Sequence, residues 1–181
     1  MTIHTGHPFA VPDPDPARRL RGRLGGAVTL WTAGAGADRA GLTVSSVLVA
    51  LGEQPALLAL LDPDADLTDR LRETGTAVVQ LLAWRERDLA EMFAGTAPAP
   101  GGPFRQAAFV DTPHGPRLAS AGTWAAVRLV GEREVGWSVE IEARIEHVEI
   151  AADAADAADA EAAGDGGAAP LLHRRGRYQR G

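Results

Sequence analysis

Residues 139–150 read VEIEARIEHVEI and carry the clearest secondary-structure signal in the chain. Charged side chains alternate along the first half of this segment with the apolar residues Val139, Ile141, Ala143 and Ile145. This alternation predicts a β-strand with one buried face and one solvent-facing side. The apolar phase shifts by one residue at Glu146-His147 before Val148, which predicts a β-bulge that bends the strand.

Other short apolar runs, separated by turn residues, occupy 27–32, 42–51, 56–61, 77–82 and 124–130. Residues 34–38, GAGAD, are typical of a hairpin loop between the first two runs. Short runs at this spacing favour an all-β barrel or sandwich over alternating βα units.

Two or three short helices accompany these strands. Asp15 followed by Pro16 predicts a capped helix that runs to about Leu24 and ends at Gly25-Gly26. A second helix is expected at Asp66, as its cap, with Leu67 and Leu71 on one face; a third carries Leu89, Met92 and Phe93.

Composition limits the chemistry of the protein. The chain has 181 residues, 45% of them hydrophobic, which suits one globular domain, and it has no Cys and no Lys. These absences exclude disulfides, thiolate chemistry, Schiff bases and Walker-type phosphate loops. The net charge of -6 argues against a nucleic-acid partner. No apolar run is long enough to cross a bilayer, and residues 1–7 lack a signal-peptide pattern, so no membrane partner and a cytoplasmic location are expected.

Metal sites are not expected. Asp62, Asp64, Asp66 and Glu73 match the spacing of ligands in a calcium loop, but Leu67 replaces the glycine that the sharp turn requires. Paired carboxylates and a catalytic triad are also missing, so no catalytic acid, base or nucleophile is predicted.

The segment Leu42-Thr43-Val44-Ser45-Ser46-Val47 is more informative because hydroxyl groups interrupt an otherwise apolar run. Buried hydroxyls need hydrogen-bond partners. Two interpretations remain open: a polar ligand lies across this strand, or Thr43, Ser45 and Ser46 bond to neighbouring backbone groups.

Five segments together resemble the flavin reductase-like, FMN-binding split-barrel family over about residues 18–178. They are GLTVSS at 41–46, Gln54-Pro55, AVVQLL at 77–82, LAEMFAG at 89–95 and PLLHRRGRY at 170–178. The resemblance implies a mainly β, Greek-key split β-barrel over 13–150. A flexible lead at 1–12, an exposed Ala/Asp loop at 151–168 and a docked tail at 169–181 flank it.

The resemblance also implies a homodimer that binds FMN or FAD and reduces it with NADH or NADPH, for use by a partner monooxygenase. Flavin contacts would fall on Gly41, Leu42, Thr43, Ser45, Ser46, Leu60, Leu61, Asp62 and Phe93. Contacts to the nicotinamide or phosphate side would fall on Trp137, His173, Arg174, Arg175 and Tyr178.

Two departures from the family pattern keep a second function open. Asp62, Asp64 and Asp66 stand where many relatives place residues that hold the flavin phosphate, and Gly136-Trp137-Ser138 replaces a Gly-Asp-His segment near the nicotinamide. Trp137 would then stack on a cofactor or fill the core. The alternative function is a non-catalytic module of the same barrel type that binds flavin or a tetrapyrrole.

Overall fold

The structure, a computed structural model, describes residues 15–151 and 169–181. The lead expected at 1–12 and nearly all of the loop expected at 151–168 lie outside these residues. The main sheet contains β2 (Thr29–Ala33), β3 (Ala40–Val44), β4 (Val47–Ala50), β5 (Ala56–Leu61), β6 (Thr76–Leu81), β9 (Trp124–Val135) and β10 (Ser138–Glu149). Its order is β3-β2-β6-β9-β10-β5-β4, and every neighbouring pair is antiparallel.

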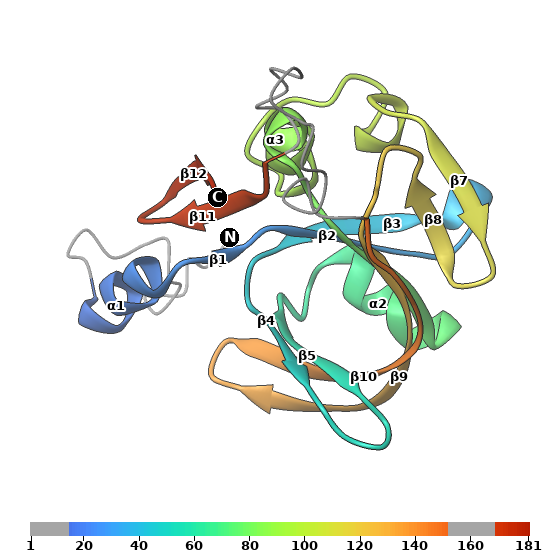
Figure 1. The fold of residues 1–181 in the computed structure, drawn as a ribbon, viewed down its shortest axis with the longest axis horizontal. Coiled ribbons are helices and arrows are strands. Elements are labelled where there is room, and N and C mark those ends of the chain that lie inside the picture. The colour runs from blue at the N-terminus through green and yellow to red at the C-terminus, as the bar shows by residue number, and fades with distance from the viewer. Residues whose placement is uncertain (1–14, 152–168) are drawn as a thin grey trace, which may run out of the picture.

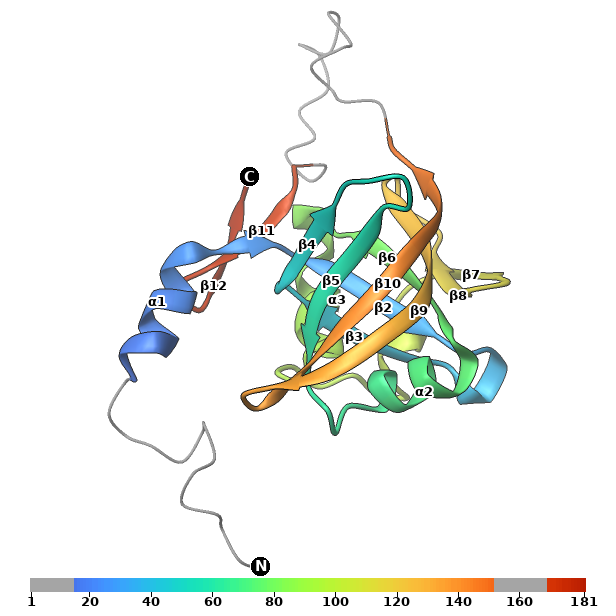
Figure 2. The same ribbon diagram turned by 90° about the horizontal axis from the view of Figure 1, so that it is seen from below.

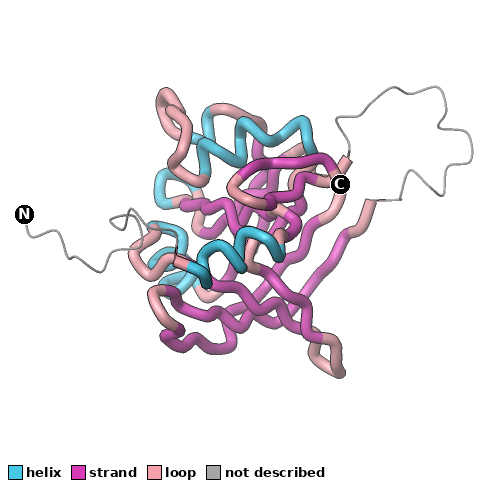
Figure 3. Tube along the Cα trace, turned by 90° about the vertical axis from the view of Figure 1, so that its left-hand side faces the viewer, coloured by secondary structure: helices cyan, strands magenta, loops and turns pink. Residues whose placement is uncertain are grey.

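This sheet curls into a split barrel, which confirms the predicted fold class (Figure 1). The α-helices among the described residues are α1 (Pro16–Leu24), α2 (Asp66–Thr74) and α3 (Arg87–Phe93). They lie around the strand body rather than within it (Figure 3). None of the described helices is long and apolar enough to cross a membrane.

A second sheet joins the two ends of the described chain. Its strands are β1 (Gly26–Ala27), β11 (Leu171–Arg174) and β12 (Arg177–Arg180), in the order β1-β11-β12. The backbone of Val28 donates to Leu171, and Leu171 donates to Leu82, at 2.8 and 2.9 Å between nitrogen and oxygen. The C-terminal hairpin is therefore bonded both to the entry into the barrel and to the end of β6.

The run at 42–51, expected as one strand, is two strands. β3 ends at Val44 and β4 begins at Val47, and the two lie at opposite edges of the main sheet. The strands are separated at Ser45-Ser46, where the apolar run is most polar and the chain passes from one edge of the sheet to the other. A one-dimensional pattern of hydrophobicity does not reveal such a change of direction.

The bulge predicted at Glu146-His147 is confirmed, because Ile145 pairs with Val127 while His147 pairs with Ala126. A second bulge lies between Glu142 and Ala143. Its extra residue is on β9, so the alternation along β10 gave no sign of it.

Two other local features differ from expectation. Ala65 rather than Asp66 is the N-cap of α2, and Asp66 is the first helical residue. The described chain also contains an unpredicted hairpin of β7 (Phe109–Thr112) and β8 (Gly115–Leu118). Its polar and Pro-containing strands lack the apolar alternation that marks the others.

Two apolar cores share β2. Trp31 lies in the barrel core, with Leu67 and Leu71 of α2, whereas Leu30 faces a second core with Leu89 and Leu171. Every residue of β2 is buried. The second core holds α3 and the C-terminal hairpin on one side of the barrel, where the cavity described next opens.

Candidate functional site

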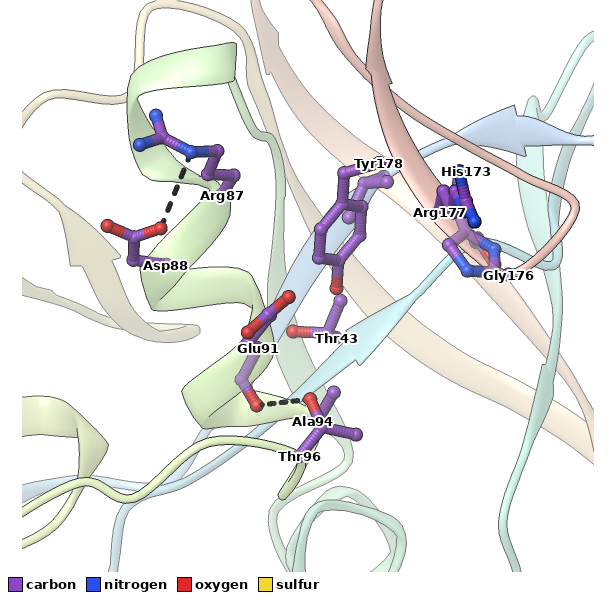
Figure 4. A pocket seen from close by; sticks show the side chains of 12 residues that line it. Thr43, Arg87, Asp88, Glu91, Ala94, Thr96, His173, Gly176, Arg177 and Tyr178 are labelled. Atoms are coloured by element: carbon purple, nitrogen blue, oxygen red, sulfur yellow. Dashed lines mark hydrogen bonds and ion pairs between the residues drawn. The ribbon is translucent and has the colours of Figure 1, made fainter.

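A cavity of about 560 Å³ opens between α3 and the β11–β12 hairpin (Figure 4). Strand β3 provides Thr43, and the turn after it provides Ser45. The complete lining is Val28, Thr43, Ser45, Arg87, Asp88, Glu91, Ala94, Thr96, His173, Gly176, Arg177 and Tyr178. Segments more than 120 positions apart in sequence therefore form one site, and its volume lies in the range of small-molecule and cofactor pockets.

His173 and Tyr178 form one wall as a cross-strand pair with their ring centroids 5.6 Å apart. Burial lowers the pKa of His173, and the nearby Arg21 guanidinium lowers it further. Burial and the Glu91 carboxylate raise the pKa of Tyr178. Both rings are therefore neutral at pH 7, and the phenol keeps the proton that it can donate to a ligand.

Charged groups lie around these neutral rings. Arg177 lines the hairpin side of the cavity, while Glu91 and the ion pair of Arg87 Nε with Asp88 Oδ1, 3.4 Å apart, line the helix side (Figure 4). The cavity thus has a cationic wall on the hairpin and a mixed wall on α3. A ligand with an anionic end and a neutral polar ring matches this distribution.

The three hydroxyls of the 42–47 segment have different partners. Thr43 Oγ1 donates to the Ala90 carbonyl oxygen at 2.7 Å, and Ser46 Oγ donates to the Leu60 carbonyl oxygen at 2.8 Å. Ser45 also lines the cavity, and its hydroxyl has no hydrogen-bond partner within the described residues. For Thr43 and Ser46 the structure therefore agrees with the second interpretation, because both hydroxyls bond to backbone carbonyl oxygens.

Several residues expected at the flavin do not line this cavity. A Cβ on Gly41 would lie 2.7 Å from Phe93 Cε1, so Gly41 allows that ring to pack, and Phe93 itself is buried. Leu42 packs against the barrel core. Leu61 is 1% exposed, so its side chain lies in that core and only its backbone is left for a ligand.

Leu60 and Asp62 lie beyond Ser46 rather than in the cavity. Leu60 is 41% exposed and its backbone pairs with Ser46. Asp62 Oδ1 accepts a hydrogen bond from the Asp64 backbone at 3.0 Å, which fixes the turn before α2. The predicted conflict between the Asp-rich turn and a phosphate therefore does not arise within this cavity.

Of the predicted tail residues, some line the cavity and others do not. His173 and Tyr178 face the cavity, but Arg174 Nε donates to the Arg23 carbonyl oxygen at 3.4 Å and Arg175 occupies the hairpin turn. Trp137 is 68% exposed in the turn between β9 and β10 and is not in the lining. This exposure excludes the interpretation that Trp137 fills the core.

Sequence reasoning missed the helix side of the site. Arg87, Asp88 and Glu91 lie on the polar side of α3, and the sequence signal there was only the apolar spacing of Leu89 and Phe93. Arg177, in the segment 170–178 that carries the family resemblance, also lines the cavity. Nothing in a single sequence distinguishes such residues from an ordinary solvated helix face.

The arrangement is suited to binding rather than to acid–base chemistry. Its lining combines neutral hydrogen-bonding rings, hydroxyls and guanidinium groups with the carboxylates of Asp88 and Glu91. No cluster of three or more possible metal ligands occurs within residues 15–151 and 169–181. A cofactor that carries its own reactivity, such as a flavin, fits this lining: its ring would meet Tyr178, His173 and the unpaired Ser45 hydroxyl, and its phosphate would meet Arg177.

Comparison with known proteins finds relatives that are named as FMN reductases. The chain is 34% identical to "FMN reductase (NADH) RutF" of Variovorax paradoxus over 94 residues, or 52% of each chain. It is 33% identical to the protein of that name from Stutzerimonas stutzeri over 81 residues, 45% of this chain and 47% of that one. The match thus spans about half the length of these relatives.

Solved structures share the fold over almost the whole chain. The NADH:FAD oxidoreductase SgcE6 of Streptomyces globisporus C-1027 has a TM-score of 0.75 at 22% identity and covers 94% of this chain and 96% of its own. The styrene monooxygenase flavin reductase SMOB of Pseudomonas putida S12 has a TM-score of 0.71 at 19% identity, with 91% and 96% covered. The profile of the "Flavin reductase like domain" family matches residues 21–181, so this chain belongs to the flavin reductase-like domain family.

Proposed function

We propose that this protein is a flavin reductase that binds FMN or FAD and reduces it with NADH. The observation that carries the proposal is the meeting of Thr43 and Ser45 with His173, Arg177 and Tyr178 around one cavity. The names of relatives support both substrates, since these include an FMN reductase (NADH) and an NADH:FAD oxidoreductase.

In this proposal the protein supplies binding and orientation. The flavin, when bound, supplies the hydride-accepting chemistry. Tyr178 would donate a hydrogen bond from its phenol to a ring acceptor, Ser45 would offer its hydroxyl, and Arg177 would hold the phosphate end. The β11–β12 hairpin forms one wall of the cavity, so it would shield one side of the ring from water and strengthen these polar contacts.

The proposal extends to the assembly. Relatives of known structure include a styrene monooxygenase flavin reductase and the flavin reductase component of a two-component tryptophan halogenase. By analogy we infer a homodimer in the cytoplasm that passes reduced flavin to a partner monooxygenase. No nucleic acid or membrane has a part in this scheme.

Two measurements test the proposal. Titration with FMN should quench flavin fluorescence with a saturable curve, and added NADH should be oxidised, with free flavin present, far faster than without the protein. Quenching without NADH turnover would instead support the non-catalytic flavin-binding module. A protein that neither quenches FMN nor oxidises NADH would refute both functions.

A further inference from the structure

The N-terminal helix α1 presents an apolar stripe that no described part of the chain covers. Leu20 is 60% exposed and Leu24 is 77% exposed, and no residue of the helix is buried. The two leucines are four positions apart, so they lie on one face. Leu20 also borders a shallow hollow of about 310 Å³ with Pro16, Arg19 and Arg23.

This stripe points away from the body of its own subunit. The Arg175 backbone nitrogen donates to the Gly22 carbonyl oxygen at 2.7 Å, and a Cβ on Gly22 would lie 3.7 Å from Arg175 Cα. Gly22 therefore faces the β11–β12 turn. At about 100° per residue, Leu20 and Leu24 each lie about 160° around the helix from Gly22.

A second apolar strip lies on the outer face of the barrel at its open edge. Among the strands of the described residues, β4 pairs only with β5, and Leu48, which is 71% exposed, lies opposite Leu58. Leu60, 41% exposed, lies two residues further along the same face of β5. An exposed apolar strip on an unpaired edge strand marks an interaction surface.

The two strips have complementary borders. Helix α1 contains four arginines and no acidic residue, although the chain as a whole has a net charge of -6. On β10, Glu142 pairs with Leu58 and Glu140 with Leu60. Glu140 is bonded to Arg133, whereas Glu142 has no ionic partner within the described residues. An apolar stripe flanked by arginine thus matches an apolar strip flanked by glutamate.

One subunit cannot bring its own two strips together. The hydrogen bond at Gly22 and a bond from Arg174 Nε to the Arg23 carbonyl oxygen hold α1 on the hairpin. Both views of the fold show α1 set apart from the seven-stranded sheet (Figures 1 and 2). A second copy related by a two-fold axis would cover both strips on both subunits with the same contact.

We propose that α1 of one subunit docks its Leu20 and Leu24 stripe onto the Leu48, Leu58 and Leu60 strip of a second copy, and reciprocally. The inference rests on the homodimer in the proposed function and gives that dimer an interface. Because Ser46 hydrogen-bonds to Leu60, the docked helix also brings arginines of the second copy beside the turn that carries Ser45.

Cross-linking tests the contact directly, because the chain contains no cysteine. Leu20→Cys and Leu48→Cys proteins are mixed and oxidised, and the expected main product is a disulfide-linked dimer with one subunit of each kind. Leu20→Cys mixed with Val110→Cys is the matched control, since Val110 is also exposed but lies on the β7–β8 hairpin. A Leu20→Cys/Leu48→Cys double variant that forms a disulfide within a single chain would overturn the proposal.

Sedimentation of Leu48→Glu adds an independent measurement, with Val110→Glu as its control. The dissociation constant of the dimer should rise about tenfold or more in Leu48→Glu, because a carboxylate enters the apolar contact, and stay unchanged in Val110→Glu. A dimer that persists in Leu48→Glu without cross-linking would refute this interface only. FMN quenching, measured on the same samples, reports on flavin binding separately, so a monomer that binds FMN would leave the reductase proposal in place.

Discussion

At the scale of single residues, Ser45 and Ser46 have different environments in spite of their adjacency. Ser45 faces the cavity without a partner, and Ser46 is bonded to Leu60. We predict that Ser45→Ala weakens FMN binding by about 1 kcal/mol, because a ligand hydrogen bond is lost. Ser46→Ala should change the affinity less. Quenching titrations of the two variants measure the difference, and an equal or larger loss in Ser46→Ala would contradict the assignment.

Glu146, the extra residue of the predicted bulge, joins several elements through its carboxylate. Its oxygens lie 2.6 Å from Arg128 Nε, 2.7 Å from His114 Nε2 and 3.4 Å from Arg144 Nη2. The hydrogen bonds from Arg128 and then His114 lower the pKa of Glu146 from 4.5 to about 2. A carboxyl whose pKa is lower in the folded state stabilises the fold above its unfolded pKa.

That stabilisation should disappear as the pH falls from about 4.5 to about 2. We therefore predict that Glu146→Gln lowers the urea midpoint at pH 7, and that the gap to the wild type closes toward pH 2. Glu134→Gln is the control. Glu134 is exposed on β9, and none of the ion pairs within the described residues includes it. A constant gap between pH 7 and pH 2 would show that the Glu146 contacts do not depend on its charge.

At the scale of elements, the β11–β12 hairpin combines a strained turn with one wall of the cavity. Arg175 has φ 53° and Gly176 has φ 74°, which is the two-residue turn that favours Asn-Gly. We predict that Arg175→Asn stabilises the protein by about 0.5 kcal/mol, because Asn adopts this conformation more readily than Arg. The KM for NADH should stay near the wild-type value.

Arg177→Ala, two residues away, should impair nucleotide binding rather than change stability. It leaves the turn intact but removes a guanidinium that lines the cavity, so the KM for NADH or the Kd for FMN should rise several-fold. Urea denaturation and steady-state kinetics on both variants separate the two roles. Loss of nucleotide affinity in Arg175→Asn with none in Arg177→Ala would reverse the assignment.

At the scale of the whole molecule, Leu171 connects the C-terminal hairpin to the second core. Its side chain is fully buried, and its backbone is bonded to Val28 and Leu82. We predict that Leu171→Ala costs about 2 to 5 kcal/mol of unfolding free energy, measured by urea denaturation, and weakens FMN binding. Leu172→Ala, at the neighbouring and partly exposed position, should cost much less. Similar losses for both would mean that the hairpin is not anchored through this core.

Alternation and turn residues were enough to predict most of the barrel strands, the first helix and the bulge at Glu146, but not the division of 42–51 into β3 and β4. These features depend on local backbone preference and on which face of a strand is buried, and both are written into neighbouring positions. The clustering of hydroxyls at 43–46 pointed to one part of the candidate site, and the resemblance of 170–178 to the flavin reductase-like family implied another.

Tertiary structure alone decided which of those residues meet. The break at Ser45-Ser46 separates β3 from β4 at the opposite edge of the sheet, and Thr43 and Ser45 line the cavity. Trp137, in the turn between β9 and β10, lies outside it. The contribution of Asp88 and Glu91, and the orientation of Leu20 and Leu24, depend on how helices are docked by distant segments. Such docking is set by packing among residues far apart in sequence, and no local pattern encodes it.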